Sequence, residues 1–163
     1  MSVSKKVLAL SLILVLALGA GGALAAKPGS EVAAVHAADD AWVKAYNAGQ
    51  VENVVALYDE NAVVYPPGAP PARGRAEIQA FFTKDIASFA TTGLVMTLGE
   101  NPDGGVSGAL GWSSGTWAAK DKSGIVVDSG WYFSVSKKVG GKWKYVRDTW
   151  NSDKPAAPAA AEK

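Results

Sequence analysis

Apolar residues recur along the first half of the chain with the spacing of helices. Between residues 31 and 46 they fall three or four positions apart and include Val35, Trp42 and Tyr46, which predicts an amphipathic helix. Gly49 then supplies a helix stop. The same spacing predicts a shorter second helix over residues 51–58 and a third over residues 75–89.

The rest of the chain alternates apolar and polar residues, as strands do. A β-branched strand is expected at residues 62–65, and hairpin-linked strands are expected at residues 94–98, 106–119, 125–136 and 143–150. The order of elements, α-α-β-α-β-β-β-β, predicts an α+β fold in which a cone-shaped, curved antiparallel sheet packs against three N-terminal helices. Glycines inside the strand at 106–119 are typical of a bulge or bend that curves the sheet.

The N-terminal segment has the pattern of a cleavable export signal. Lys5 and Lys6 precede an apolar stretch and an Ala-Leu-Ala cleavage motif at residues 23–25. The apolar stretch is about a dozen residues long, shorter than the roughly 20 that a membrane-spanning helix needs. We therefore expect a periplasmic or secreted protein without a stable membrane anchor. The predicted divisions are a signal peptide at 1–25, a domain at 26–153 and a disordered Pro/Ala-rich tail at 154–163.

The composition narrows the chemistry that the chain can perform. The 163 residues contain no Cys, which excludes a thiolate nucleophile and a Cys-ligated metal. Sixteen basic and fifteen acidic residues leave a net charge of +1, which argues against nucleic-acid binding. No Walker-type loop, G-x-S-x-G elbow or H-E-x-x-H motif is present, and no cofactor is expected. Acid/base chemistry by carboxylates and tyrosines remains, as does binding without chemistry.

Three segments carry a resemblance to a known family: VALYDENAVVYPPG at residues 55–68, GRAEIQAFF at 74–82 and KWKYVRDTWN at 142–151. Together with the predicted order of elements, they resemble the ketosteroid isomerase and SnoaL-like group of the nuclear transport factor two-like, cystatin-like cone superfamily. The resemblance covers residues 31–153 and implies a cone with an interior pocket. Members of this superfamily include isomerases, polyketide cyclases, dehydratases and association domains that catalyse nothing, so the resemblance is specific for fold and weak for function.

The resemblance also implies that the pocket is kept while the isomerase chemistry is replaced. Tyr65 or Pro66 stands where those isomerases have a carboxylate base. Trp42 takes the place of the oxyanion-stabilising tyrosine, and Phe133 that of a protonated aspartate. Cavity-lining aromatic positions of the family are matched at positions 58, 82 and 150. The predicted ligand-binding residues are Trp42, Tyr58, Tyr65, Phe82, Trp131, Phe133 and Trp150.

Asp148 is the predicted catalytic residue. It lies two positions before Trp150 on the last strand, so the two side chains share one face of the sheet. A carboxyl group in an apolar, aromatic pocket has a raised pKa, which suits it to carry a proton near neutral pH. The alternatives are a structural ion pair between Asp148 and Arg147, and a role for Asp128 on the preceding strand.

The first helix carries three further polar candidates, His36, Asp39 and Asp40. The spacing of His36 and Asp39 could supply half a metal site, but without further nitrogen or sulfur ligands a surface or cap contact is expected, and no metal is predicted. Asp39 and Asp40 are expected to form a solvated patch, although one of them could turn toward the mouth of the cone.

The resulting prediction is an exported domain that binds a small hydrophobic organic ligand in an aromatic cavity. One version is a cofactor-independent acid/base enzyme of isomerase, cyclase or dehydratase type. The alternative is a non-catalytic ligand-binding or protein-association module. In either version we expect a homodimer in which two copies of the chain pack together through the face of the sheet.

Overall fold

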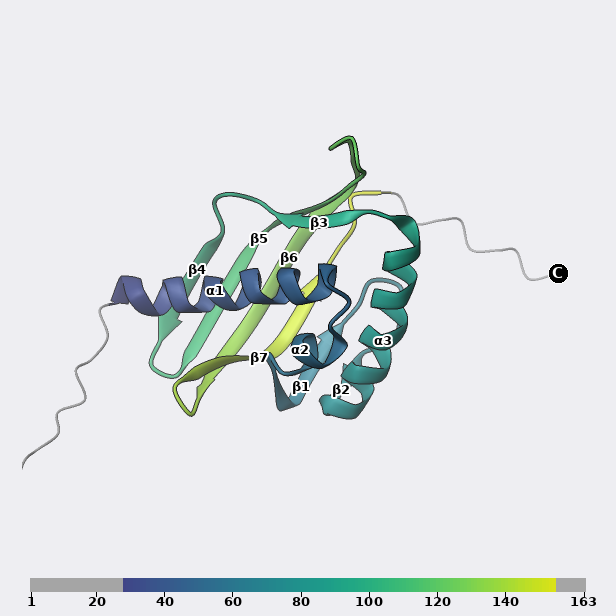
Figure 1. The fold of residues 1–163 in the computed structure, drawn as a ribbon. Coiled ribbons are helices and arrows are strands. Elements are labelled where there is room, and N and C mark those ends of the chain that lie inside the picture. Colours follow the sequence, from purple (N-terminus) through teal and green to yellow (C-terminus); the bar gives the residue numbers. More distant parts are fainter. Residues whose placement is uncertain (1–27, 155–163) are drawn as a thin grey trace, which may run out of the picture.

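The computed structural model describes residues 28–154, and in this range three helices pack on one face of a curved, open sheet (Figure 1). The expected signal peptide at 1–25 and residues 155–163 of the expected tail lie outside the described residues. Within the described part, no helix is long and apolar enough to cross a membrane. The α+β architecture with helices on one side of a curved sheet is therefore confirmed.

The helices follow the apolar spacing of the sequence. Their bounds are α1 (Pro28–Asn47), α2 (Val51–Val55) and α3 (Gly74–Thr92). The stop predicted at Gly49 is present: this residue has a φ of 70° and its N–H donates to the Tyr46 carbonyl oxygen at 3.0 Å. In Figure 1, α1 crosses the sheet while α3 stands beside α2 and β1, so the helices cover only one face.

Seven strands form one sheet. They are β1 (Tyr58–Tyr65), β2 (Ala72–Arg73), β3 (Val95–Leu98), β4 (Asp103–Ser107), β5 (Leu110–Lys120), β6 (Val126–Val139) and β7 (Lys142–Trp150). The order across the sheet is β2-β1-β7-β6-β5-β3, and β4 pairs with the part of β5 that β3 leaves free.

Three details of the sheet differ from the expected order of elements. The long strand predicted at 106–119 is split by a turn at Gly108, which has a φ of 60°, so β4 and β5 form a hairpin. The Pro-rich loop after β1 contains β2, which pairs with β1 through Val63 and Arg73. Finally, β1 runs parallel to β7, so the sheet is mixed and not purely antiparallel. The turn residues of a hairpin predict pairing only between strands that follow each other in the sequence. Because β7 is far from β1 along the chain, they could not predict this parallel pair.

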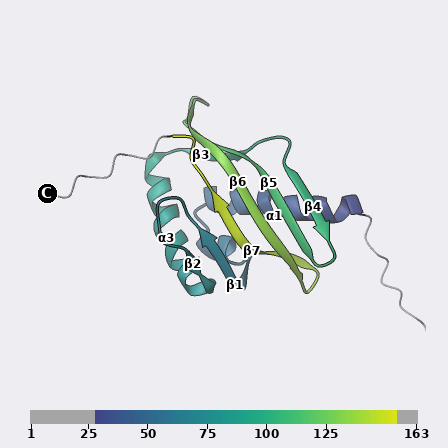
Figure 2. The same cartoon turned by 180° about the vertical axis from the view of Figure 1, so that it is seen from behind.

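The core fills the space between the helices and the covered face of the sheet. Tyr58 and Phe82 lie at its centre with almost no exposed surface, and their ring centroids are 5.7 Å apart. Because side chains alternate across a strand, residues of one strand divide between this core and the uncovered face. In β6, Ser134 is buried, whereas Trp131 and Phe133 are 58% and 45% exposed. Figure 2 shows the sheet from its uncovered face, with α1 behind the strands.

Gly130 allows the residue that follows β7, Asn151, to lie against β6. A Cβ atom at this position would lie 1.9 Å from the carbonyl oxygen of Asn151. The same oxygen accepts a hydrogen bond from the Trp117 indole N–H at 3.0 Å, and the Asn151 N–H donates to the Trp131 carbonyl oxygen at 3.0 Å. The close approach at Gly130 therefore positions both Asn151 and the Trp117 ring.

Gly130→Ala should destabilise the fold, because the added methyl group meets a main-chain oxygen that cannot rotate away. We expect the free energy of unfolding to fall by about 1–3 kcal/mol, measured by urea denaturation with tryptophan fluorescence. Gly29→Ala is the matched control, since a Cβ there meets nothing within 4 Å. An equal loss in both variants would contradict the packing role given to Gly130.

Candidate functional site

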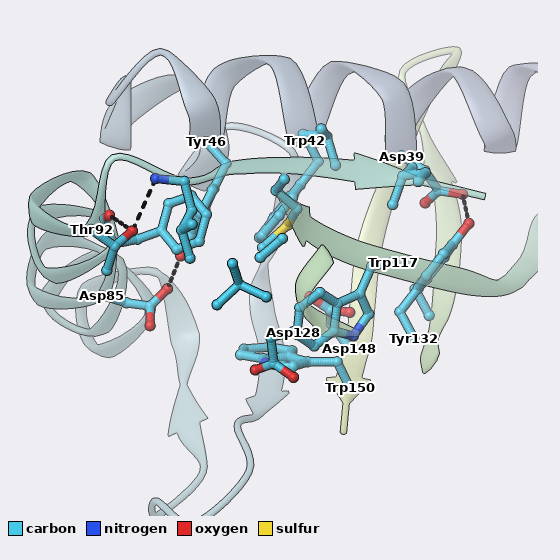
Figure 3. A pocket seen from close by; sticks show the side chains of 18 of the residues that line it. Asp39, Trp42, Tyr46, Asp85, Thr92, Trp117, Asp128, Tyr132, Asp148 and Trp150 are labelled. Atoms are coloured by element: carbon cyan, nitrogen blue, oxygen red, sulfur yellow. Dashed lines mark hydrogen bonds between the residues drawn. The ribbon is translucent and has the colours of Figure 1, made fainter. Parts of the chain in front are cut away.

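A pocket of about 330 Å³ lies between α1, the end of α3 and the covered face of the sheet. Figure 3 shows that aromatic side chains surround it, with carboxyl groups placed between them. Its apolar wall also includes Leu94, Met96 and Leu98 from the segment around β3. The aromatic lining residues are Trp42, Tyr46, Phe89, Trp117, Tyr132, Tyr145 and Trp150.

Asp148 enters the pocket wall from β7, on the same face as Trp150. Its Oδ2 accepts a hydrogen bond of 2.5 Å from the hydroxyl of Tyr58, and that hydroxyl accepts one of 2.9 Å from the indole N–H of Trp42. Burial raises the pKa of Asp148 to about 6; the Tyr58 hydrogen bond opposes this shift, and the nearby Asp39 carboxylate adds to it. This carboxyl group can therefore gain and lose a proton near neutral pH.

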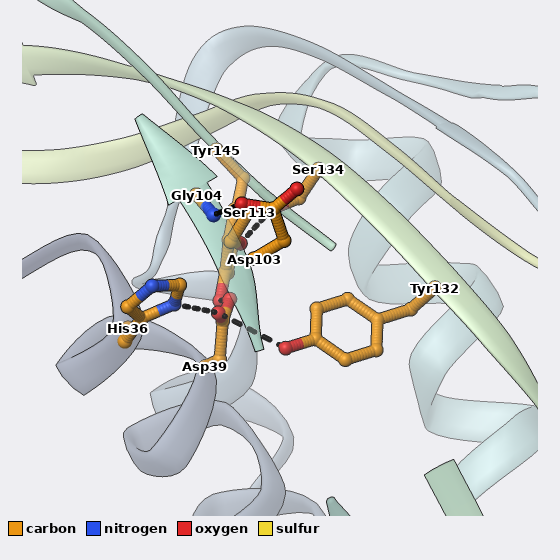
Figure 4. A network of polar contacts seen from close by, with 8 residues as sticks. All are labelled: His36, Asp39, Asp103, Gly104, Ser113, Tyr132, Ser134 and Tyr145. Atoms are coloured by element: carbon orange, nitrogen blue, oxygen red, sulfur yellow. Dashed lines mark hydrogen bonds and ion pairs between the residues drawn. The ribbon is translucent and has the colours of Figure 1, made fainter. Parts of the chain in front are cut away.

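Asp39 forms a second polar centre of the pocket (Figure 4). Its Oδ1 accepts a hydrogen bond of 2.6 Å from Tyr145, and its Oδ2 lies 3.4 Å from the Tyr132 hydroxyl and 3.6 Å from His36 Nδ1. Burial raises the pKa of the Asp39 carboxyl, although the hydrogen bond from Tyr145 lowers it.

The solvated patch expected on α1 is therefore wrong for Asp39, which is 6% exposed and lines the pocket, as in the alternative that one of the two carboxyl groups turns toward the cone; Asp40 is exposed. Asp39 occupies a position of the apolar helix face, four residues after Val35 and three before Trp42. That spacing was the signal in the sequence that could have identified it as a buried residue.

Two further carboxyl groups line the pocket. Asp85 of α3 accepts a hydrogen bond of 2.7 Å from the Tyr46 hydroxyl, and burial raises its pKa. Asp128 of β6 accepts hydrogen bonds from the Ser129 N–H at 2.8 Å and the Ser152 hydroxyl at 2.7 Å. Sequence reasoning proposed Asp128 as the alternative to Asp148 but missed Asp85, because its distance from Tyr46 is set only by the packing of α3 on α1.

The seven aromatic residues predicted to bind ligand occupy three different places. Trp42 and Trp150 line the pocket. Tyr58 and Phe82 are buried in the core beside Trp42, so they support the wall from behind.

The other three predicted residues are not brought to the pocket. Tyr65, Trp131 and Phe133 point away from the helices and are 40–58% exposed. The register of β6 explains the last two, because Tyr132 and Ser134 take the inward positions and alternation directs their neighbours outward.

Carboxyl and hydroxyl groups of the site are paired with each other and are not gathered at one point. In residues 28–154 no three His, Asp or Glu side chains come together in a group that could hold a metal ion. The carboxyl groups are distributed around an aromatic pocket, and tyrosine hydroxyls hydrogen-bond three of them.

Comparison with protein-family models places these features in a family. The model described as a SnoaL-like domain matches residues 40–146. The chain belongs to the SnoaL-like domain family. The matched residues include Trp42, Tyr46, Asp85, Asp128 and Tyr132, but end just before Asp148. No curated protein matches the SnoaL-like chain.

Solved structures agree on the fold. A ketosteroid isomerase-like protein from Erwinia carotovora atroseptica is 20% identical, with 77% of this chain and 98% of that chain covered at a TM-score of 0.61. An NTF2-like protein with a cystatin-like fold from Novosphingobium aromaticivorans is 18% identical, with 78% and 84% covered at 0.66. A protein of unknown function with a cystatin-like fold from Nostoc punctiforme is 14% identical, with 78% and 94% covered at 0.65. At these identities the likeness supports the cone fold alone.

Because the pKa of Asp148 is raised, the effect of Asp148→Asn on stability should depend on pH. The substitution keeps an oxygen atom that can accept the hydrogen bond from the Tyr58 hydroxyl. In the folded protein the pKa of Asp148 is about 6, whereas the ordinary pKa of an aspartate side chain is 3.8. Rising pH between these values therefore lowers the free energy of unfolding of the wild type, because the unfolded chain ionises first. The variant lacks this loss. We therefore expect the free energy of unfolding of the variant, minus that of the wild type, to be about 2–3 kcal/mol larger at pH 7.5 than at pH 4.

Urea denaturation of both proteins at the two pH values measures this difference. Other titrating groups are common to the two proteins and cancel in the comparison. If Asp148→Asn changes the stability equally at pH 4 and pH 7.5, the effect comes from packing and the assigned pKa is wrong.

Proposed function

We propose that this SnoaL-like domain binds a small hydrophobic organic molecule in the aromatic pocket and performs acid/base chemistry on it without a cofactor. The observation that carries the proposal is the Asp148 carboxyl group in the pocket wall, with a pKa of about 6 and a hydrogen bond from Tyr58. Solved structures of the same fold include one from Streptomyces avermitilis that is provisionally named a dehydratase of the NTF2-like family. Isomerisation, cyclisation and elimination all need the proton transfer that such a carboxyl group can provide.

In this proposal Asp148 acts as the base. Tyr58 and Trp42 form a hydrogen-bonded chain that fixes the orientation of the carboxylate, so the group needs no rearrangement before it accepts a proton. Asp148 removes a proton from a carbon atom next to a carbonyl group and returns it to another carbon of the same molecule. The Tyr132 hydroxyl also lines the pocket, on the neighbouring strand β6, where it donates to Asp39 Oδ2 at 3.4 Å.

Proton exchange into D2O tests the enzymatic version. Wild-type protein should accelerate exchange of the α-protons of small aromatic ketones, measured by proton NMR. Asp148→Asn should lower the rate by about 10²–10⁴-fold, the usual contribution of a positioned general base. Binding of the same ketones, followed by tryptophan fluorescence, should change little. Exchange at the wild-type rate in the variant would refute the role of Asp148, and bound ketones without any exchange would favour the non-catalytic alternative.

We also propose that two copies of the chain associate through the uncovered face of the sheet. Trp131 and Phe133 are 58% and 45% exposed there, and Phe133 stacks on Trp112 of β5 with ring centroids 6.2 Å apart. An exposed aromatic surface on a sheet that is covered on its other side supports an interface. The same surface supports the alternative of a protein-association module. We further propose that the protein is exported and that residues 1–25 are its cleaved signal peptide.

Phe133→Lys should weaken the dimer, because it places a charge in the middle of the proposed interface. We expect the dimer dissociation constant to rise by about 100-fold or more, measured by sedimentation over a range of concentrations. Ile125→Lys is the control, since Ile125 is 64% exposed and lies just before β6. A monomeric wild type, or equal weakening in both variants, would contradict this interface. Native mass spectrometry of the same samples would also report any bound ligand.

A further inference from the structure

The charged residues of the pocket wall are strongly biased to one sign. Four lining residues are aspartates, from α1, α3, β6 and β7, and the one basic lining residue is Lys154 at the end of the described chain. The whole protein, by contrast, has nearly equal numbers of acidic and basic residues. The pocket is therefore far more acidic than the protein as a whole.

Three of the four pocket carboxyl groups, those of Asp85, Asp128 and Asp148, form no ion pair with a basic side chain in the part of the chain that the structure describes. The ion pairs found there join Lys137 to Asp59 and Lys138 to Glu31, both outside the pocket, and His36 to Asp39. Asp85 and Asp148 instead accept hydrogen bonds from neutral tyrosine hydroxyls. A hydroxyl satisfies an oxygen atom but leaves the negative charge of the carboxylate uncompensated.

The spaces between these carboxyl groups are filled by aromatic rings. Trp42, Trp117 and Trp150 lie around the hollow in Figure 3, with Tyr46 at the side of α3. The face of an indole ring carries partial negative charge and attracts an organic cation. The carboxyl groups come from separate elements and do not gather into a metal-binding group, so a single small metal ion does not suit them. A cation with apolar substituents can contact both the rings and the carboxylates.

We propose that the ligand of this pocket is an organic cation, an amine or quaternary ammonium compound with an apolar or aromatic body. The inference rests on the proposed ligand-binding function and specifies its ligand class. A volume of about 330 Å³ accommodates a molecule of this kind. An anionic ligand would meet like charge on four sides, and a neutral ligand would leave the carboxylates uncompensated.

The ionisation behaviour of the pocket agrees with a missing positive charge. Burial raises the pKa of Asp39, Asp85 and Asp148, and the Asp39 carboxylate adds to the raised pKa of Asp148. A bound cation would lower all three values, since it stabilises the ionised form of each carboxyl group.

Binding of two probes with one shape tests the proposal. Phenyltrimethylammonium and tert-butylbenzene differ only in the replacement of a charged nitrogen by a carbon atom. Their dissociation constants are measured by tryptophan fluorescence for wild type, Asp85→Asn, Asp128→Asn and the exposed control Glu52→Gln. The two asparagine variants keep an oxygen for the hydrogen bonds that Asp85 and Asp128 accept. Thermal unfolding checks that each variant is folded.

We expect phenyltrimethylammonium to bind the wild type, and each asparagine variant to weaken it by about threefold or more. Binding of tert-butylbenzene should change by less than about twofold in every variant, and Glu52→Gln should affect neither probe. If both probes bind and neither responds to the asparagine substitutions, the cation inference fails while the proposed ligand pocket stands. If neither probe binds the wild type, the pocket does not admit molecules of this size, and both proposals fail.

Discussion

Burying a carboxyl group costs free energy unless its oxygen atoms are hydrogen-bonded, and this protein meets that constraint three times with a tyrosine hydroxyl. Tyr145 of β7 donates a hydrogen bond to Asp39 of α1. In the same way Tyr46 of α1 donates to Asp85 of α3, and Tyr58 of β1 donates to Asp148 of β7. Each pair joins two different elements around the pocket. The pairs therefore connect α1, α3 and the parallel strands β1 and β7 at the places where the pocket wall is formed.

The choice of tyrosine as the partner has an electrostatic consequence. A lysine or arginine would neutralise the carboxylate and hold its pKa low, whereas a hydroxyl leaves the cost of burial largely in place. Accordingly the pKa of Asp148 is raised to about 6, and the pKa values of Tyr58 and Tyr145 are raised well above their ordinary range. The same feature that makes Asp148 suitable for proton transfer also makes the pocket attractive to a positively charged molecule.

The aromatic residues of the sheet are divided between its two faces. The covered face presents Trp117, Tyr132 and Trp150 to the pocket, and the uncovered face presents Trp131 and Phe133 to solvent. This division follows from alternation along β5, β6 and β7, so a shift of register by one residue in a strand would move its aromatic residues to the other face. Membership of the SnoaL-like family accounts for the cone fold, while the chemistry must be argued from the side chains that this chain places in it.

Local patterns of apolar residues and turn residues in the sequence determined most of the helices and strands. Apolar spacing identified α1 and α3, the stop at Gly49 was correctly located, and alternation placed Asp148 on the same face as Trp150. Such features depend on residues close together in the chain, which is why periodicity and turn residues predict them.

Only the tertiary structure decided which residues meet across the pocket. The parallel pairing of β1 with β7, the approach of Asp85 to Tyr46 and the burial of Asp39 against Tyr145 all join positions far apart in sequence. Alternation establishes that Trp131 and Phe133 share a face, but it does not say which face the helices cover. That choice depends on how α1 packs across the finished sheet, a contact that no local pattern contains.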